Sequence, residues 1–171
     1  WGFEPKAEKK LSLGLAKVLG RPQEFQGINI RSASGEQIGQ GPAGKKASGI
    51  LMVDGILYMI ARNAAHSLLA WSTDHAQTWT WSDWRFTESM GCPTFLNFGK
   101  NYTGARDDYV YLYSHDSDSA YAAADRMILA RVQKDEIREK KAYEFYAGMQ
   151  GDQPIWAKDI SRRKPVFVHP G

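Results

Sequence analysis

The feature that most constrains the fold of this chain is a succession of short apolar and aromatic runs separated by turn residues. Two of these runs flank Asp54-Gly55, and an Asp-Gly pair in that position is a strong signal for a β-hairpin. Two more runs follow at the spacing of an antiparallel meander, so one four-stranded sheet is expected. The pattern predicts an all-β protein, a sandwich or a propeller. The runs are residues 47–53, 56–61, 67–72 and 80–86.

The same pattern extends to both sides of this sheet. A second set of strands is expected at residues 92–98, 109–114, 126–132 and 143–146, with helical turns in the charged segment 134–141. Two strands precede the first set, and another begins near Val166. The count favours a β-propeller segment of about two and a half four-stranded blades in a single domain, residues 1–171. Its parts are a half blade at residues 11–30, blades at 45–87 and 91–148, and the start of the next blade at 164–171, with the Gly- and Ser-rich segment 31–46 as an alternative domain boundary.

Composition argues against several classes of protein. The chain has six Trp and eight Tyr among 171 residues, which favours β-structure. Its net charge of +3 and its scattered Lys and Arg residues provide no basic stripe for nucleic acid. No apolar run approaches the roughly 20 residues of a transmembrane helix, so no membrane partner is expected. The single Cys92 cannot form an internal disulfide, which leaves the compartment open, with export expected if a leader preceded Trp1.

Residues 72–79, Ser-Thr-Asp-His-Ala-Gln-Thr-Trp, form the most specific motif. The Ser and Asp side chains can hydrogen-bond nearby backbone amides and close a tight turn, and the Trp can seal the sheet. Ala76 is unfavourable if its position needs a positive φ angle. The motif resembles the Asp box, the S-x-D-x-G-x-T-W turn that joins the third and fourth strands of a blade in sialidases and related propellers. The matching residues, Ser72, Asp74, Thr78 and Trp79, are therefore expected to be structural.

A wider resemblance covers residues 44–171. This region is similar to an uncharacterised bacterial family of five-bladed propellers that is distantly related to glycoside hydrolases. The resemblance implies the propeller fold and supplies no biochemical activity. The segments that carry it are Gly44-Lys45-Lys46-Ala47-Ser48-Gly49, Ala70-Trp71-Ser72-Thr73-Asp74, Phe86-Thr87-Glu88-Ser89, Gly91-Cys92-Pro93-Thr94-Phe95 and Tyr113-Ser114-His115-Asp116-Ser117-Asp118.

The resemblance also implies where a site would lie, because sialidase-like propellers bind ligands on the face opposite the Asp-box turn. The loops expected on that face are residues 31–46, 62–66, 87–91, 115–125 and 149–164. Their carboxylates are candidate catalytic groups, since glycoside hydrolysis uses paired carboxylates: Glu88, Asp116 and Asp118. The candidate substrate-binding residues are Lys45, Arg62, Asn63, His115 and Arg126, with the arginines as clamps for a ligand carboxylate.

Each candidate also has a structural interpretation. Asp116 and Asp118 are equally compatible with a solvated loop that caps its own backbone, and a lone Glu88 is more often a surface residue. An arginine at a strand end is also a common partner for a nearby Asp. His115 with the two Asp residues forms a weak calcium alternative that lacks a full loop pattern, and no zinc spacing or other cofactor motif is present.

Two functions of different classes are compatible with this sequence. One is a glycosidase-like or sialidase-like propeller protein that binds a saccharide and, if it is an enzyme, hydrolyses it. The other is a non-catalytic propeller module that binds a glycan or a protein partner. A partial ring exposes strand edges and apolar flanks, so a homodimer that completes the ring is also expected.

Overall fold

The computed structural model describes residues 15–30, 45–62 and 66–170. These residues form three antiparallel sheets and several short 3₁₀ turns, and the described part of the chain contains no α-helix. The prediction of an all-β protein is confirmed at that level. None of the described helices is long and apolar enough to cross a membrane.

The first large sheet is an antiparallel meander in the order β3-β4-β5-β6. Its four predicted strands are confirmed to within two residues at each end. The sharp turn between β3 and β4 uses Asp54 (φ 49°) and Gly55 (φ 80°), both left-handed, as an Asp-Gly hairpin turn requires. The strands are β3 (Lys46–Val53), β4 (Ile56–Arg62), β5 (Leu68–Ser72) and β6 (Thr80–Arg85).

The turn between β5 and β6 forms the hydrogen bonds expected from its sequence. The Ser72 hydroxyl donates to Asp74 Oδ1 (2.7 Å) and accepts from the Ala76 amide (2.8 Å). The second Asp74 oxygen accepts from the Thr78 hydroxyl (2.6 Å). The hydrogen bonds from Thr78, and then that from Ser72, lower the pKa of Asp74 to about 2. Ala76 adopts a φ of 72°, so the position does need the left-handed conformation, and Trp79 is 6% exposed against the sheet.

The second large sheet contains β7, β8, β9 and β10, in that spatial order. Its two middle strands match the prediction, and the charged segment after β9 forms the 3₁₀ turns η2 (Lys134–Glu136) and η3 (Lys140–Ala142). The first strand is much shorter than the predicted 92–98, because Pro93 has no amide to donate and Asn97 instead caps the turn at Gly99. The strands are β7 (Thr94–Phe95), β8 (Tyr109–His115), β9 (Arg126–Gln133) and β10 (Glu144–Gln150).

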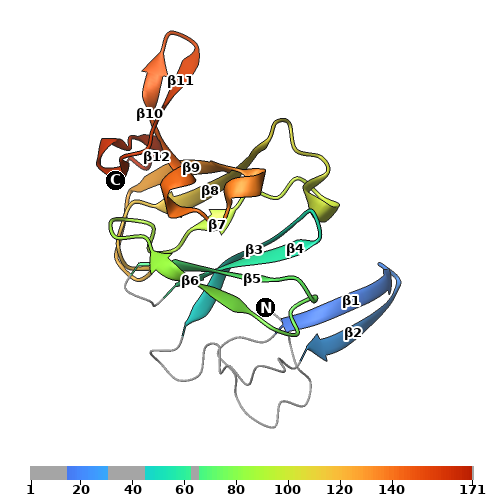
Figure 1. Ribbon diagram of the computed structural model, residues 1–171. Coiled ribbons are helices and arrows are strands. Elements are labelled where there is room, and N and C mark those ends of the chain that lie inside the picture. The colour runs from blue at the N-terminus through green and yellow to red at the C-terminus, as the bar shows by residue number, and fades with distance from the viewer. Residues whose placement is uncertain (1–14, 31–44, 63–65, 171) are drawn as a thin grey trace.

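The C-terminal strands differ from the prediction. β11 (Gln153–Ala157) was not expected; it forms a hairpin with β10 that projects from the body of the molecule in Figure 1. β12 (Pro165–Val168) was expected to open a further blade at residues 164–171, but it pairs with β9. β10 pairs with β9 only at Glu144 and Phe145 and then turns away. The edge of β9 that it leaves open is taken by β12.

A separate hairpin precedes the first large sheet. It consists of β1 (Leu15–Arg21) and β2 (Glu24–Ile30), two antiparallel strands where the sequence predicts a pair of strands. Residues 11–14 and most of segment 31–46 lie outside the described residues. In Figure 1 the hairpin lies beside the first large sheet, and Leu15 packs against the Trp79 side of that sheet.

The two large sheets stack on one apolar core. Alternate residues of β3, β4 and β5 meet alternate residues of β8 and β9, as the period-two pattern of each strand requires. β3 and β7 approach so closely that a Cβ on Gly49 would lie 3.0 Å from the Phe95 amide nitrogen. The buried core residues include Leu51, Val53, Ile60 and Leu69 from the first sheet and Val110, Leu112, Ile128, Ala130 and Val132 from the second.

Candidate functional site

Within the described residues, the loops after β4, β6 and β8 lie at one end of the two sheets. Arg62 ends β4, Leu68 begins β5 opposite Ala61, and Arg85 near the end of β6 pairs with Leu68. In the second sheet, His115 at the end of β8 pairs with Met127 at the start of β9. The antiparallel register therefore places these loops at the end of the first sheet opposite to the turn at residues 72–79.

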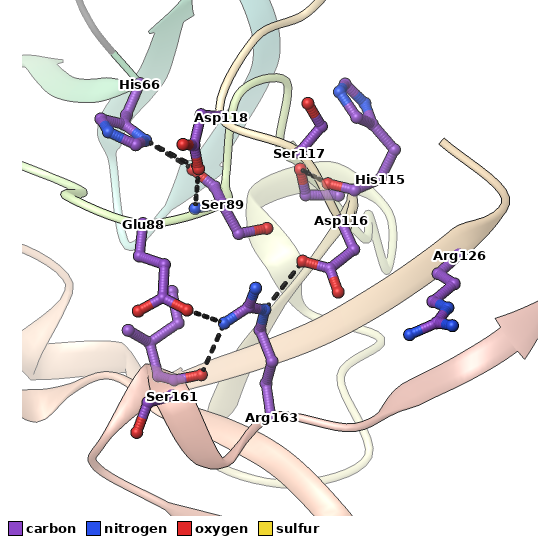
Figure 2. A network of polar contacts seen from close by, with 12 residues as sticks. His66, Glu88, Ser89, His115, Asp116, Ser117, Asp118, Arg126, Ser161 and Arg163 are labelled. Atoms are coloured by element: carbon purple, nitrogen blue, oxygen red, sulfur yellow. Dashed lines mark hydrogen bonds and ion pairs between the residues drawn. The ribbon is translucent and has the colours of Figure 1, made fainter. Parts of the chain in front are cut away.

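Arg163 joins two of the predicted carboxylates. Its Nε donates to Asp116 Oδ1 at 2.8 Å, and its Nη1 donates to Glu88 Oε1. Figure 2 shows the guanidinium lying between the two acids, one from the loop after β6 and one from the loop after β8. The side chains of Arg163 and Asp116 are 18% and 17% exposed, and that of Glu88 is 44% exposed. We call these three residues the carboxylate–arginine cluster.

Electrostatics hold the charge on Arg163. Partial burial acts to lower the pKa of its guanidinium, but the hydrogen bonds and charges of Glu88 and Asp116 outweigh this effect and raise it. The guanidinium also donates to the Ile160 carbonyl at 3.1 Å. This carbonyl belongs to the 3₁₀ turn η4 (Ile160–Arg162), which begins with a hydrogen bond from the Ser161 amide to Asp159. The cluster is thus fixed by both sheets and by the chain that returns to β9.

Sequence reasoning missed Arg163. Its neighbour Arg162 lies in the same 149–164 loop but is exposed, whereas Arg163 is half-buried. The available signal was the basic run from Arg162 to Lys164, which has no local partner acids after Asp159. The partners of Arg163 lie 75 and 47 residues away along the chain.

Asp118 belongs to a second set of contacts beside the cluster. Its Oδ1 accepts from the Ser89 amide at 2.6 Å and lies 3.6 Å from His66 Nδ1. His66 Nδ1 lies 2.9 Å from the Ser89 carbonyl oxygen, and because a carbonyl only accepts, Nδ1 carries the proton. The Ser89 hydroxyl is buried without a hydrogen-bond partner among the described residues, so this Ser, His and Asp do not form a nucleophilic triad.

The loop that carries Glu88 and Ser89 is strained and tightly packed. Ser89 and Met90 have φ angles of 51° and 53°, and His66 in the neighbouring loop before β5 has one of 70°; these are unusual for residues with a Cβ. Gly91 donates its amide to Ser117 at 2.8 Å, and a Cβ on Gly91 would lie 2.6 Å from the Asp118 carbonyl carbon. Glycine at this position therefore permits the two loops to touch, and strain of this kind concentrates at functional sites.

The predicted substrate-binding residues do not all meet at the cluster. The Arg62 guanidinium lies 5.3 Å from the ring centre of Tyr121, which connects β4 to the loop after β8. Arg126 pairs with Asp125 at 3.6 Å and lies apart from the cluster in Figure 2.

The other predicted binding residues have separate partners. Lys45 lies 4.8 Å from the ring of Trp81, a residue of β6 that packs with the Trp79 side of the first sheet. His115 Nε2 contacts the Ser119 carbonyl at 2.8 Å, and Figure 2 shows its ring pointing away from Asp116. Asn63 lies outside the described residues.

The calcium alternative finds no support in this geometry. Asp116 faces Arg163 and Asp118 faces Ser89, while His115 turns to its own loop. Among the residues that the structure describes, no three His, Cys, Asp or Glu side chains lie together in a way that could hold a metal ion.

The cluster can bind polar groups more readily than it can cleave a bond. A glycosidase needs two carboxylates on opposite sides of the scissile bond, whereas Glu88 and Asp116 meet on one guanidinium. Each acid gives one oxygen to Arg163, and its second oxygen can accept a further hydrogen bond. No protein-family model matches this chain, and no curated protein is detectably similar to it in sequence.

Proposed function

We propose that this protein is a saccharide-binding module of the β-propeller type, with its binding site at the loop end of the two large sheets. The carboxylate–arginine cluster forms the polar floor of this site. Tyr121, 66% exposed beside Arg62, provides an aromatic face on which a sugar ring stacks. In this account the protein binds its ligand without hydrolysing it.

The propeller assignment is supported by how the sheets relate to each other. Each is built on an antiparallel meander, as propeller blades are. They share one core face to face, and β3 and β7, the first strands of the two meanders, lie against each other at Gly49. Neighbouring blades around a central axis have both properties.

One observation carries the choice of binding over catalysis: Arg163 bridges Glu88 and Asp116. In a glycosidase, one acid protonates the leaving group while the second carboxylate acts from the opposite face of the sugar. Glu88 and Asp116 are held on the same side by one arginine, so they are poorly placed for these two roles. A bridged pair of this kind presents fixed acceptors instead, and polar groups fixed in advance give a pocket its orientation and specificity.

The experiment is a parallel test of binding and turnover on one panel of neutral oligosaccharides and the corresponding chromogenic glycosides. We expect binding without turnover, and about fivefold weaker binding by Tyr121→Ala, because ring stacking contributes about 1 kcal/mol. Ile50→Ala is the control, since Ile50 is also exposed (45%) but lies within β3. Turnover that Glu88→Gln abolishes would establish a glycosidase instead, and a panel with no ligand would reject the saccharide proposal.

We also propose that two copies associate through their open flanks. Large apolar side chains are exposed at both ends of the described chain, among them Val18 and Phe25 on the first hairpin and Phe167 on β12. On the outer face of the second sheet, Arg131 is stacked between Tyr109 (4.0 Å) and Trp156 (4.1 Å). Apolar and aromatic faces of this kind are typical of surfaces that pack against another sheet.

A further inference from the structure

A cavity lies away from the loop end of the sheets. It is at the end of the first sheet where β3 turns into β4, and β4 runs from this end to the carboxylate–arginine cluster at the other. Its volume of about 290 Å³ is near the lower limit for ligand pockets, which suits a small molecule. The lining residues come from the β3–β4 hairpin and from the connection between β9 and β10: Val53, Asp54, Ile56, Tyr58, Lys134, Asp135 and Arg138.

The structure holds Arg138 firmly in this cavity. Its guanidinium lies 5.0 Å from the ring centre of Trp71, and its carbonyl accepts a hydrogen bond from Trp84 Nε1 at 2.8 Å. The preceding residue, Ile137, is fully buried, and its carbonyl accepts from the Tyr143 hydroxyl at 2.8 Å. Both the backbone and the guanidinium are thus fixed before any ligand arrives, which lowers the entropy cost of binding.

Arg138 also has an unused donor. Its Nε is buried and has no hydrogen-bond partner among the described residues. A buried N–H without a partner is costly, and more so on a charged group. Tyr58 lines the same cavity; burial raises the pKa of its hydroxyl, and Arg138 opposes that rise. Tyr58 therefore keeps its proton and can donate a hydrogen bond to a ligand.

The charges around the cavity select the ligand. Nε and a neighbouring Nη of an arginine form a planar pair of donors that matches a carboxylate. Lys134 already lies 3.4 Å from Asp108, so Arg138 is the cation that the lining offers to an anion. Asp54 and Asp135 are exposed at the rim and would repel a simple anion, but they suit an ammonium group.

We propose that this cavity binds a small zwitterion, a free amino acid with an apolar side chain. The ligand carboxylate pairs with Arg138, and its ammonium group faces Asp135. The apolar side chain packs against Val53 and Ile56. This site is independent of the saccharide proposal, since it shares no residue with the carboxylate–arginine cluster.

The test is calorimetric titration of the full chain with leucine, with 4-methylpentanoate, which lacks the amine, and with 3-methylbutylamine, which lacks the carboxylate. We expect leucine to bind at least about tenfold more tightly than either half, because each charged end contributes a separate interaction. Equal binding of leucine and one of its halves would overturn the proposal, and so would the absence of leucine binding at millimolar concentration.

Two variants locate the site. Arg138→Lys keeps the charge but loses the paired donors, so leucine should bind about tenfold or more weakly, whereas the exposed Arg162→Lys should bind normally. Asp135→Asn removes a rim charge from an exposed residue and should weaken leucine while leaving 4-methylpentanoate unchanged or tighter. If Arg138→Lys fails to fold, the effect of Asp135→Asn on leucine affinity tests the proposal by itself. Leucine affinity unaltered by the folded variants would overturn the proposal.

Discussion

At the scale of single residues, Asp74 makes the turn between β5 and β6 sensitive to acid. Its folded-state pKa of about 2 lies below the ordinary value of 3.8, so the carboxylate contributes stability that is present above pH 3.8 and lost as the pH falls toward about 2. The free energy of unfolding of the wild type should fall more steeply across this window than that of Asp74→Asn. Urea titrations at several pH values measure the difference, and parallel curves for the two proteins would contradict this role of Asp74.

Arg163 is the residue on which the candidate site depends. Replacement by Met removes both charged hydrogen bonds, and we expect a loss of about 2 kcal/mol in the free energy of unfolding. The exposed Arg162→Met should change it by less than about 0.5 kcal/mol. Adding Asp116→Asn to Arg163→Met should cost less than the sum of the two single changes. Equal stability of the Arg163 and Arg162 variants would show that the bridge is not formed in solution.

Contacts between residues close in the sequence could be predicted, whereas contacts between distant residues could not. Ser72, Asp74 and Thr78 contact each other within one turn, so their spacing alone predicts the hydrogen bonds that are observed. Glu88 and Asp116 could be assigned to one end of the sheets from the strand order. Their shared contact with Arg163 could not be predicted, because side-chain pairing across three loops produces no periodic pattern in the sequence.

At the scale of elements, Gly91 sets the distance between the loop after β6 and the loop after β8. Gly91→Ala would place a methyl group 2.6 Å from the Asp118 backbone, and we expect about 1–3 kcal/mol of destabilisation from the forced separation. Gly27→Ala on β2 is the control, since nothing lies within 4 Å of its added Cβ. Thermal or urea unfolding of both variants makes the comparison; an unaffected Gly91→Ala would show that the loops do not touch.

The strands of this protein show which structural features the sequence pattern predicts. Strands with clear alternation, such as β8 with every second residue buried, were predicted nearly to the residue. β11 was missed because Gln153–Ala157 contains a Pro and has no apolar alternation. β12 was expected as a strand, but its partner was not, since the choice depends on β10 leaving the edge of β9.

At the scale of the whole molecule, the exposed flanks predict self-association. Val18, Phe25 and Phe167 are 65%, 67% and 55% exposed, and sheets with such open apolar sides tend to pair. Light scattering on a sizing column should give a mass near twice 19.2 kDa. A mass of 19.2 kDa at every concentration would contradict the dimer and would leave the two-sheet unit as a monomeric module.

The central claim is that the loop end of the two sheets binds a saccharide, and mapping of backbone amide shifts by NMR tests it most directly. Titration with an oligosaccharide from the panel should move the amides of residues 88–91, 116–121 and 161–163, and leave those of the opposite turn at residues 73–78 in place. Shifts confined to that turn, or to residues 134–138 at the cavity beside the β3–β4 hairpin, would contradict the claim. So would a spectrum that no saccharide changes.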